Sequence, residues 1–260
     1  MICRAIEGHA AHTPDAVALR FEDAVITYGG LLRHVAAAAQ WLQEMGIDHG
    51  DRVAFLGHNH PSQLVLLLAS AQIGALHVPL NWRLAVPELA AILEDSEAVV
   101  LFATPEMQHL AHRAAPEGCE VLEATAAWPG LAREEAVLPR PLPEPGDGML
   151  LVYTSGTTGQ PKGALIDRQG LLFNALNARH MFGLGAADRV LTVLPLFHVG
   201  GLNIQTLPAL VAGAEVVLLP RFDPAGFFAA CATHRPTLTL VVPAVMRALL
   251  ADPGWAGATL

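Results

Sequence analysis

Short apolar runs rich in Val and Leu alternate along the chain with longer segments whose apolar residues recur at helical spacing. The short runs predict strands at 16–21, 24–28, 51–57, 77–80, 98–103, 119–124, 149–154, 189–195, 215–219 and 237–242. The longer segments predict helices at 28–45, 61–74, 87–96, 105–114, 168–182, 201–212, 224–234 and from 243 onward. Almost wholly apolar strands separated by helices are typical of parallel sheets covered on both faces. We therefore expect an α/β protein with layered, mostly parallel sheets flanked by helices.

One stretch rich in Pro and Gly interrupts this alternation. Residues 139–148 read "PRPLPEPGDG", a composition typical of an extended connector. We therefore expect a first α/β subdomain over 1–138, a connector over 139–148 and a second α/β segment over 149–260. A single surface loop within one larger domain is the alternative, because 260 residues allow either organisation.

The composition is unusually apolar, with 53% hydrophobic residues, 15% charged residues and a mean hydropathy of +0.41. Strands buried on both faces would explain this, and so would an apolar surface meant for a missing partner or domain.

The formal net charge of −9 is opposite to the basic surface that nucleic-acid binding requires. Residues 1–16 lack the apolar core of a signal peptide, and the most apolar window, from Leu64, is broken by Gln72 and His77. We expect a cytoplasmic protein with no membrane span and no nucleic-acid partner.

Neither the cysteines nor the histidines show the spacing of a metal site. Cys3, Cys119 and Cys231 lie far apart and predict reduced, buried thiols. The His pairs within 9–12, 58–60 and 109–112 have no companion acid or thiol in a usual ligand pattern. No metal-ligating residue is therefore assigned.

The stretch "LLVYTSGTTGQPKGALI", residues 150–166, is the strongest chemical signal. Its polar part begins at Thr154, at the carboxyl end of the strand predicted over 149–154, where ligands bind in α/β folds. Its glycines let the main chain approach a ligand, its hydroxyls donate hydrogen bonds, and its lysine adds a positive charge. The residues concerned are Thr154, Ser155, Gly156, Thr157, Thr158, Gly159 and Lys162. We expect a polyphosphate-binding loop, with a merely polar connection between strand and helix as the alternative.

The order of these residues differs from the common P-loop, because Pro161 precedes Lys162 and Gly163 follows it. The run "YTSGTTGQPKGA" instead resembles the phosphate loop of the adenylate-forming enzymes, which include acyl-CoA synthetases, aryl-CoA ligases, luciferases and peptide-synthetase adenylation domains. A second stretch, "VLPLFHVGGLN" at 193–203, resembles the next motif of that family, in which an aromatic–His pair borders the acyl pocket. Flanking stretches such as "GDRVAFLGHN" and "LVAGAEVVLLPRFDP" also read like acyl-CoA synthetase sequence. The resemblance covers nearly the whole chain.

This resemblance implies ATP-dependent activation of a carboxylic acid to an acyl-adenylate, followed by thioester formation with CoA. ATP, Mg²⁺ and CoA are the implied cofactors, and a carboxylic acid and CoA are the implied partners. The resemblance assigns Thr154 to Gly159 and Lys162 to ATP, and Phe197, His198 and Gly201 to the acyl substrate. A histidine satisfied at a strand end is the alternative for His198, and no catalytic residue is assigned.

Members of the family are roughly twice as long as this chain. Their adenine-binding, ribose-binding and Mg²⁺-binding motifs and their C-terminal lid domain lie downstream of the part that this chain resembles. We therefore expect an N-terminal fragment that is inactive alone, with the C-terminal half as a candidate partner. A non-catalytic remnant that binds a nucleotide or a partner without turnover is the main alternative. An oxidoreductase of the luciferase type shares the same motifs.

Overall fold

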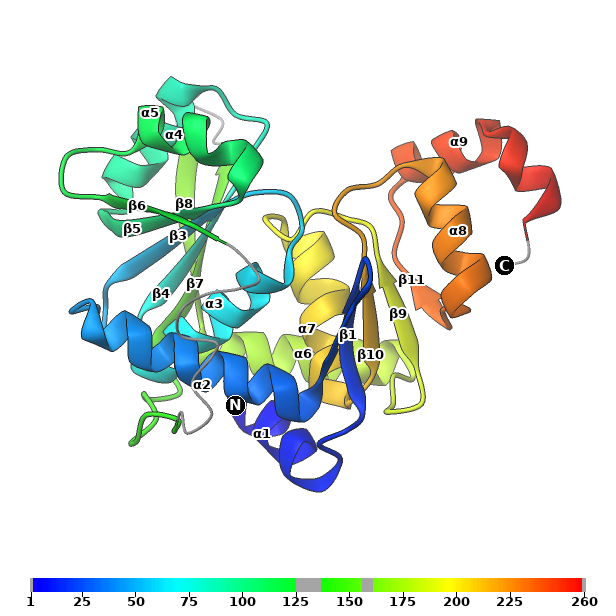
Figure 1. Cartoon of the computed structure of the whole chain (residues 1–260), viewed down its shortest axis with the longest axis horizontal. Coiled ribbons are helices and arrows are strands. Elements are labelled where there is room, and N and C mark those ends of the chain that lie inside the picture. Colours follow the sequence, from blue (N-terminus) through cyan, green and yellow to red (C-terminus); the bar gives the residue numbers. More distant parts are fainter. Residues whose placement is uncertain (1, 125–136, 156–160, 259–260) are drawn as a thin grey trace. The chain divides into compact units, whose positions relative to one another are not determined.

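The computed structural model describes residues 2–124, 137–155 and 161–258 (Figure 1). Their contacts form two compact units. The first unit contains Gly30–Leu172, and the second joins Ile2–Gly29 to Phe173–Leu260. These units divide the chain at other points than the expected boundaries at 138 and 149, so the proposed subdomains remain a prediction. Residues 139–147 form neither helix nor strand.

The first unit contains a six-stranded sheet in the order β6-β5-β3-β4-β7-β8. Its strands are β3 (Arg52–Leu56), β4 (Leu76–Leu80), β5 (Ala98–Ala103), β6 (Glu120–Glu123), β7 (Gly148–Ser155) and β8 (Pro161–Asp167). Every neighbouring pair is parallel except β7 with β8, which is antiparallel. The predicted α/β class with mostly parallel sheets is confirmed, but β8 replaces what the sequence presented as loop.

Helices cover both faces of this sheet. On one face, α4 (Val86–Asp95) and α5 (Gln108–Ala114) form a buried core with residues of β3, β4 and β5, and a short 3₁₀ turn, η1 (Pro105–Met107), precedes α5. On the other, Trp41 of α2 (Tyr28–Glu44) packs on Phe102 of β5, with 5.5 Å between ring centroids. The helix α3 (Pro61–Ile73) is buried at every position, as its lack of a polar face requires, and ends at Gly74, whose φ is 83°.

The second unit contains a five-stranded sheet in the order β11-β9-β10-β1-β2. Its strands are β1 (Val17–Phe21), β2 (Ala24–Thr27), β9 (Arg189–Thr192), β10 (Glu215–Leu218) and β11 (Leu238–Thr239). The strands predicted at 16–21 and 24–28 are confirmed as the antiparallel pair β1 and β2, and the remaining pairs are parallel. The edge strand β11 is much shorter than the predicted strand at 237–242.

The remaining helices are α1 (Ile2–His12), α6 (Arg168–Phe182), a π-helix η3 (Gly200–Thr206), α7 (Leu207–Ala212), α8 (Pro224–His234), α9 (Pro243–Ala251) and a 3₁₀ turn η4 (Pro253–Gly257). The helix α1 was not predicted, and the predicted helix at 201–212 is divided into a π-helical and an α-helical part. On one face of the sheet, α8 and α9 bury Phe227 and Leu249 with Leu191 and Val217. None of the helices in the described part of the chain has the length and apolar character needed to span a bilayer.

A histidine lies in the core of the first unit. His77 of β4 is fully buried, and neither ring nitrogen has a hydrogen-bond partner among the residues that the structure describes. Burial disfavours the charged ring and lowers the pKa of His77 to about 3. The folded protein therefore keeps this ring neutral well below neutral pH.

We predict that His77 makes the protein sensitive to acid. The unfolded chain protonates this ring near 6.5, whereas the folded protein does so only near 3. Below pH 6.5 the unfolded state binds the additional proton, so the free energy of unfolding falls as the pH drops, by up to about 1.4 kcal/mol per unit. Urea unfolding between pH 7.5 and 4.5 should show a shallower decline for His77→Leu than for the wild type. The same substitution at the exposed His112 should leave the wild-type slope, and equal slopes for all three proteins would disprove the role of His77.

Candidate functional site

The predicted phosphate-binding residues lie at the end of a β-hairpin where β7 stops and β8 begins. Thr154 of β7 is paired with Lys162 of β8, and Ser155 is paired with Pro161. Residues directly opposite each other on antiparallel strands project from the same face. The exposed side chains of Thr154 and Lys162 are therefore neighbours on one face of the hairpin. Gly156, Thr157, Thr158 and Gly159 lie outside the described residues, and Ser155 is described by its backbone alone.

This hairpin corrects the expectation that the loop joins a strand directly to a helix. Residues 161–167 form the edge strand β8 before α6 begins at Arg168. Proline is compatible with the first residue of an edge strand, because its missing N–H is not needed by a further neighbour. The motif therefore spans both strands of the hairpin, and its two ends are held together by main-chain hydrogen bonds.

Lys162 is the only lysine in the sequence, and the other basic residues among the 15 Lys and Arg are arginines. An ammonium group on a flexible stem can follow a phosphate oxygen, and the hydroxyl of Thr154 can donate a hydrogen bond to the same anion. The residues that the structure places here thus fit a polyphosphate. Among the described residues, no group of three or more His, Cys, Asp and Glu side chains could hold a metal ion.

The second predicted group lies in the other unit, between β9 and the π-helix. The backbone N–H of Gly200 donates to Nδ1 of His198 at 3.1 Å. Because Nδ1 accepts this bond, a neutral ring carries its proton on Nε2 and presents a donor there. The ring of His198 is exposed, and Phe197 beside it is half-buried. His198 can therefore donate a hydrogen bond to an acidic ligand.

Gly201 is required by the packing of its own backbone. A Cβ atom at this position would lie 2.4 Å from the carbonyl oxygen of Pro195 and 2.6 Å from that of Leu194. Only glycine allows the π-helix to begin so close to the preceding loop. The structure thus gives Gly201 a conformational role, and its contact with an acyl substrate stays a prediction.

Gln205, which was not predicted, connects the π-helix to β9. Its fully buried side chain donates to the carbonyl oxygen of Leu191 at 2.8 Å and to Oγ1 of Thr192 at 3.0 Å. Its Oε1 accepts from the N–H of Leu240 at 3.2 Å. A glutamine in a helical segment whose other residues are mostly apolar was the available signal. π-Helices are rare and frequently occur at functional sites, so this support under the His198 segment is consistent with a binding role.

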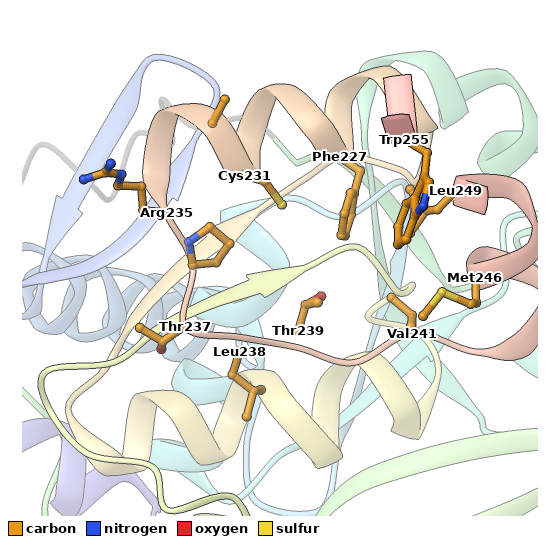
Figure 2. Close-up of a pocket in the computed structure, with 12 residues that line it drawn as sticks. Phe227, Cys231, Arg235, Thr237, Leu238, Thr239, Val241, Met246, Leu249 and Trp255 are labelled. Atoms are coloured by element: carbon orange, nitrogen blue, oxygen red, sulfur yellow. The ribbon is translucent and has the colours of Figure 1, made fainter. Parts of the chain in front are cut away.

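A separate cavity of about 560 Å³ lies in the second unit, among α8, β11, α9 and η4 (Figure 2). Its lining is mostly apolar, with Phe227, Leu249 and Trp255 on one side and Arg235 at one end. Burial raises the pKa of Cys231 in this cavity, which disfavours the reactive thiolate. None of the predicted site residues that the structure describes lines the cavity, so its size alone does not make it the candidate site.

The AMP-binding enzyme family matches residues 6–259. The chain belongs to this family. Its relatives include the indoleacetate–CoA ligase of Aromatoleum aromaticum, which is 43% identical to it. The alignment is 270 residues long and covers 98% of this chain and 52% of the ligase. A feruloyl-CoA synthase of an Amycolatopsis species is 41% identical, with 96% of this chain and 50% of the synthase covered. This member of the AMP-binding enzyme family is thus a homologue of acid–CoA ligases, and it spans about half the length of these relatives.

Solved structures agree with the assignment of the family and the fold. The N-terminal domain of FACL13 from Mycobacterium tuberculosis matches with a TM-score of 0.89 and 28% identity, covering 99% of this chain and 67% of that one. ATP-bound MatB from Rhodopseudomonas palustris matches with a TM-score of 0.85 and 27% identity, covering 97% of this chain and 52% of that one. The resemblance to adenylate-forming enzymes and the fold of their N-terminal part are confirmed.

The packing around Gly201 gives a direct test. Gly201→Ala should lower the free energy of unfolding by about 1–3 kcal/mol or more, because the new methyl group overlaps two carbonyl oxygens. Gly8→Ala is the matched control, since Gly8 lies in α1 with nothing within 4 Å of an added Cβ. That variant should be more stable than the wild type by about 0.5–1 kcal/mol. Urea unfolding would measure both, and equal stability of the two variants would contradict this account of Gly201.

Proposed function

We propose that this chain is the N-terminal part of an ATP-dependent acid–thiol ligase that converts a carboxylic acid to an acyl-adenylate and then to an acyl-CoA. The observation that carries the proposal is the pairing of Thr154 with Lys162 at the motif hairpin, in a chain whose relatives include CoA ligases. The cytoplasm, where ATP and CoA are available, is the proposed location.

In the first step, a carboxylate oxygen of the acid attacks the α-phosphorus of ATP. The bond from that phosphorus to the bridging oxygen breaks, which releases pyrophosphate and leaves the acyl-adenylate. In the second step, the sulfur of CoA attacks the acyl carbon, AMP departs, and the thiol proton is released. The carboxylate is already an anion, so the first step needs no general base. The difficulty is to bring two anions together and to stabilise the departing pyrophosphate.

The residues of this chain supply binding and orientation. Lys162 and Thr154 contact oxygens of the polyphosphate, together with the motif residues from Ser155 to Gly159. Bound Mg²⁺ would supply further neutralisation of the phosphate charge. In the second unit, His198 donates from Nε2 to the carboxylate of the acid, and Phe197 offers an apolar wall to its carbon skeleton. Gly201 lets the start of the π-helix lie close to the backbone of Leu194 and Pro195, which precede Phe197 and His198.

The substrate class is proposed from the relatives. The names of the two relatives above refer to indoleacetate and to a feruloyl group, and the acyl group is aromatic in both. We therefore propose an aromatic carboxylic acid as the substrate, with fatty acids and small dicarboxylic acids as comparisons. Binding of ATP without turnover is the outcome that would favour a non-catalytic remnant.

The activity is tested with two polypeptides. One is the 260-residue chain, and the other is this chain followed by the remaining part of the Aromatoleum ligase. Each is supplied with ATP, Mg²⁺, CoA and a panel of aryl, fatty and dicarboxylic acids, and pyrophosphate release is measured. We expect acid-dependent release from the joined polypeptide, with aromatic acids preferred. Folded protein that binds ATP and releases no pyrophosphate with any acid would refute the ligase proposal.

Lys162 is tested by substitution. Lys162→Ala should weaken ATP binding by about 10- to 100-fold, because a charge-assisted hydrogen bond to a phosphate is lost. Titration calorimetry with ATP gives the affinity. Arg113→Ala removes an exposed cation from α5 and should leave the affinity unchanged. Unchanged affinity in Lys162→Ala would remove Lys162 from the site.

A further inference from the structure

The residue before the motif threonine faces the opposite side of the hairpin. Tyr153 and Thr154 are consecutive on β7, so their side chains project from opposite faces of the sheet. Tyr153 packs against the buried core to which α4 contributes. Its hydroxyl donates to Oδ2 of Asp95, the last residue of α4, at 2.5 Å. The strand that carries Thr154 is thus connected directly to the end of a helix.

Gly163 leaves the space that this tyrosine needs. It is paired with Tyr153 across the hairpin, next to the pair of Thr154 with Lys162. A Cβ atom at position 163 would lie 3.1 Å from Cζ of Tyr153, 3.3 Å from its hydroxyl oxygen and 3.0 Å from Cδ1 of Leu151. The backbone of Gly163 does not have a positive φ. An added methyl group would therefore be tight against Leu151 and the ring of Tyr153, and these side chains would have to shift by a few tenths of an ångström to admit it.

The charge of Asp95 strengthens this contact. A carboxylate at the C-terminal end of a helix faces the negative end of the helix dipole, so a donor that compensates it is favoured. Burial, followed by the hydrogen bond to Asp95 and its charge, raises the pKa of Tyr153. The hydroxyl stays protonated at neutral pH and remains a donor. Hydrogen bonds from a hydroxyl to a carboxylate are among the strong ones in proteins.

We propose that Tyr153 is a positioning residue for phosphate binding. Through Asp95 it holds the end of the β7–β8 hairpin that carries the motif against α4, and this fixes Thr154 and Lys162 on the other face in the arrangement that a polyphosphate requires. Gly163 serves the same purpose by admitting the ring. The inference rests on the proposed phosphate-binding role of Lys162.

The single lysine makes this testable without turnover. Reductive methylation with ¹³C-formaldehyde labels Lys162 and the N-terminal amine, because the sequence contains no other lysine. The ¹³C-methyl signal of Lys162, assigned by its loss in Lys162→Ala, is then followed while inorganic tripolyphosphate is added. The midpoint of its shift gives the dissociation constant of the folded protein.

In Tyr153→Phe we expect this dissociation constant to rise by a factor of about 3 to 30, as the loss of one charge-assisted hydrogen bond allows. Asp95→Ala should have the same effect, whereas Asp95→Asn, which keeps an acceptor for the hydroxyl, should largely restore binding. Gly163→Ala should also weaken binding, because its methyl group displaces the ring. A ring with only a structural role would lower stability and leave the affinity of the folded protein unchanged.

The other tyrosine of the chain supplies a matched control. Tyr28 is buried in the second unit, where its hydroxyl donates to the carbonyl oxygens of Leu210 at 3.2 Å and Ala214 at 2.8 Å. Tyr28→Phe should lose stability and keep the wild-type affinity for tripolyphosphate. The inference is overturned if Tyr153→Phe binds within about twofold of the wild type. If the wild-type Lys162 signal does not respond to tripolyphosphate, the proposed phosphate binding falls, and the inference falls with it.

Discussion

The antiparallel pairing of β7 with β8 is the constraint on which the candidate site depends. On its other edge β7 pairs with β4 in the parallel sheet, where His77 lies opposite Leu150. The hairpin is therefore part of the central layer of its unit. The register places the side chains of Thr154 and Lys162 on one face and Tyr153 with Gly163 on the other. A slip by one residue would exchange the two faces and turn Lys162 toward the core side.

In the second unit, the side chain of Gln205 replaces part of the main-chain pairing at the edge of the sheet. Its edge strand β11 makes only a two-residue pairing with β9, so the chain that follows loses the hydrogen bonds of a longer ladder. Gln205 supplies one of them by accepting from the N–H of Leu240, while it also binds the end of β9. The same glutamine lies in the π-helix that follows His198. Gln205 thus both supports the edge of the sheet and holds the π-helix that follows His198.

Much of the fold follows from the pattern of apolar residues, because buried strands and helices differ in length and period. The pattern misses β8, since most of this edge strand is exposed and its apolar residues do not alternate with a buried face. It overestimates β11, because a side chain takes the place of main-chain pairing there. Lys162 and its motif could be chosen as candidate phosphate-binding residues from the order of neighbouring residues in the sequence alone. The partner of Tyr153 could not, since Asp95 lies 58 positions away and the two meet only when the sheet and α4 have formed.

The contact between Tyr153 and Gly163 also bears on how such a motif can vary through evolution. The glycine after the motif lysine would ordinarily be attributed to the ligand, yet its neighbours are the side chains of Leu151 and Tyr153 on the side away from the proposed phosphates. The packing of these two side chains therefore restricts the composition of the motif itself. A homologue with smaller residues in place of both Tyr153 and Leu151 escapes this restriction and can accept a side chain in place of Gly163. An exchange at positions 151 and 153 thus changes what is tolerated at position 163.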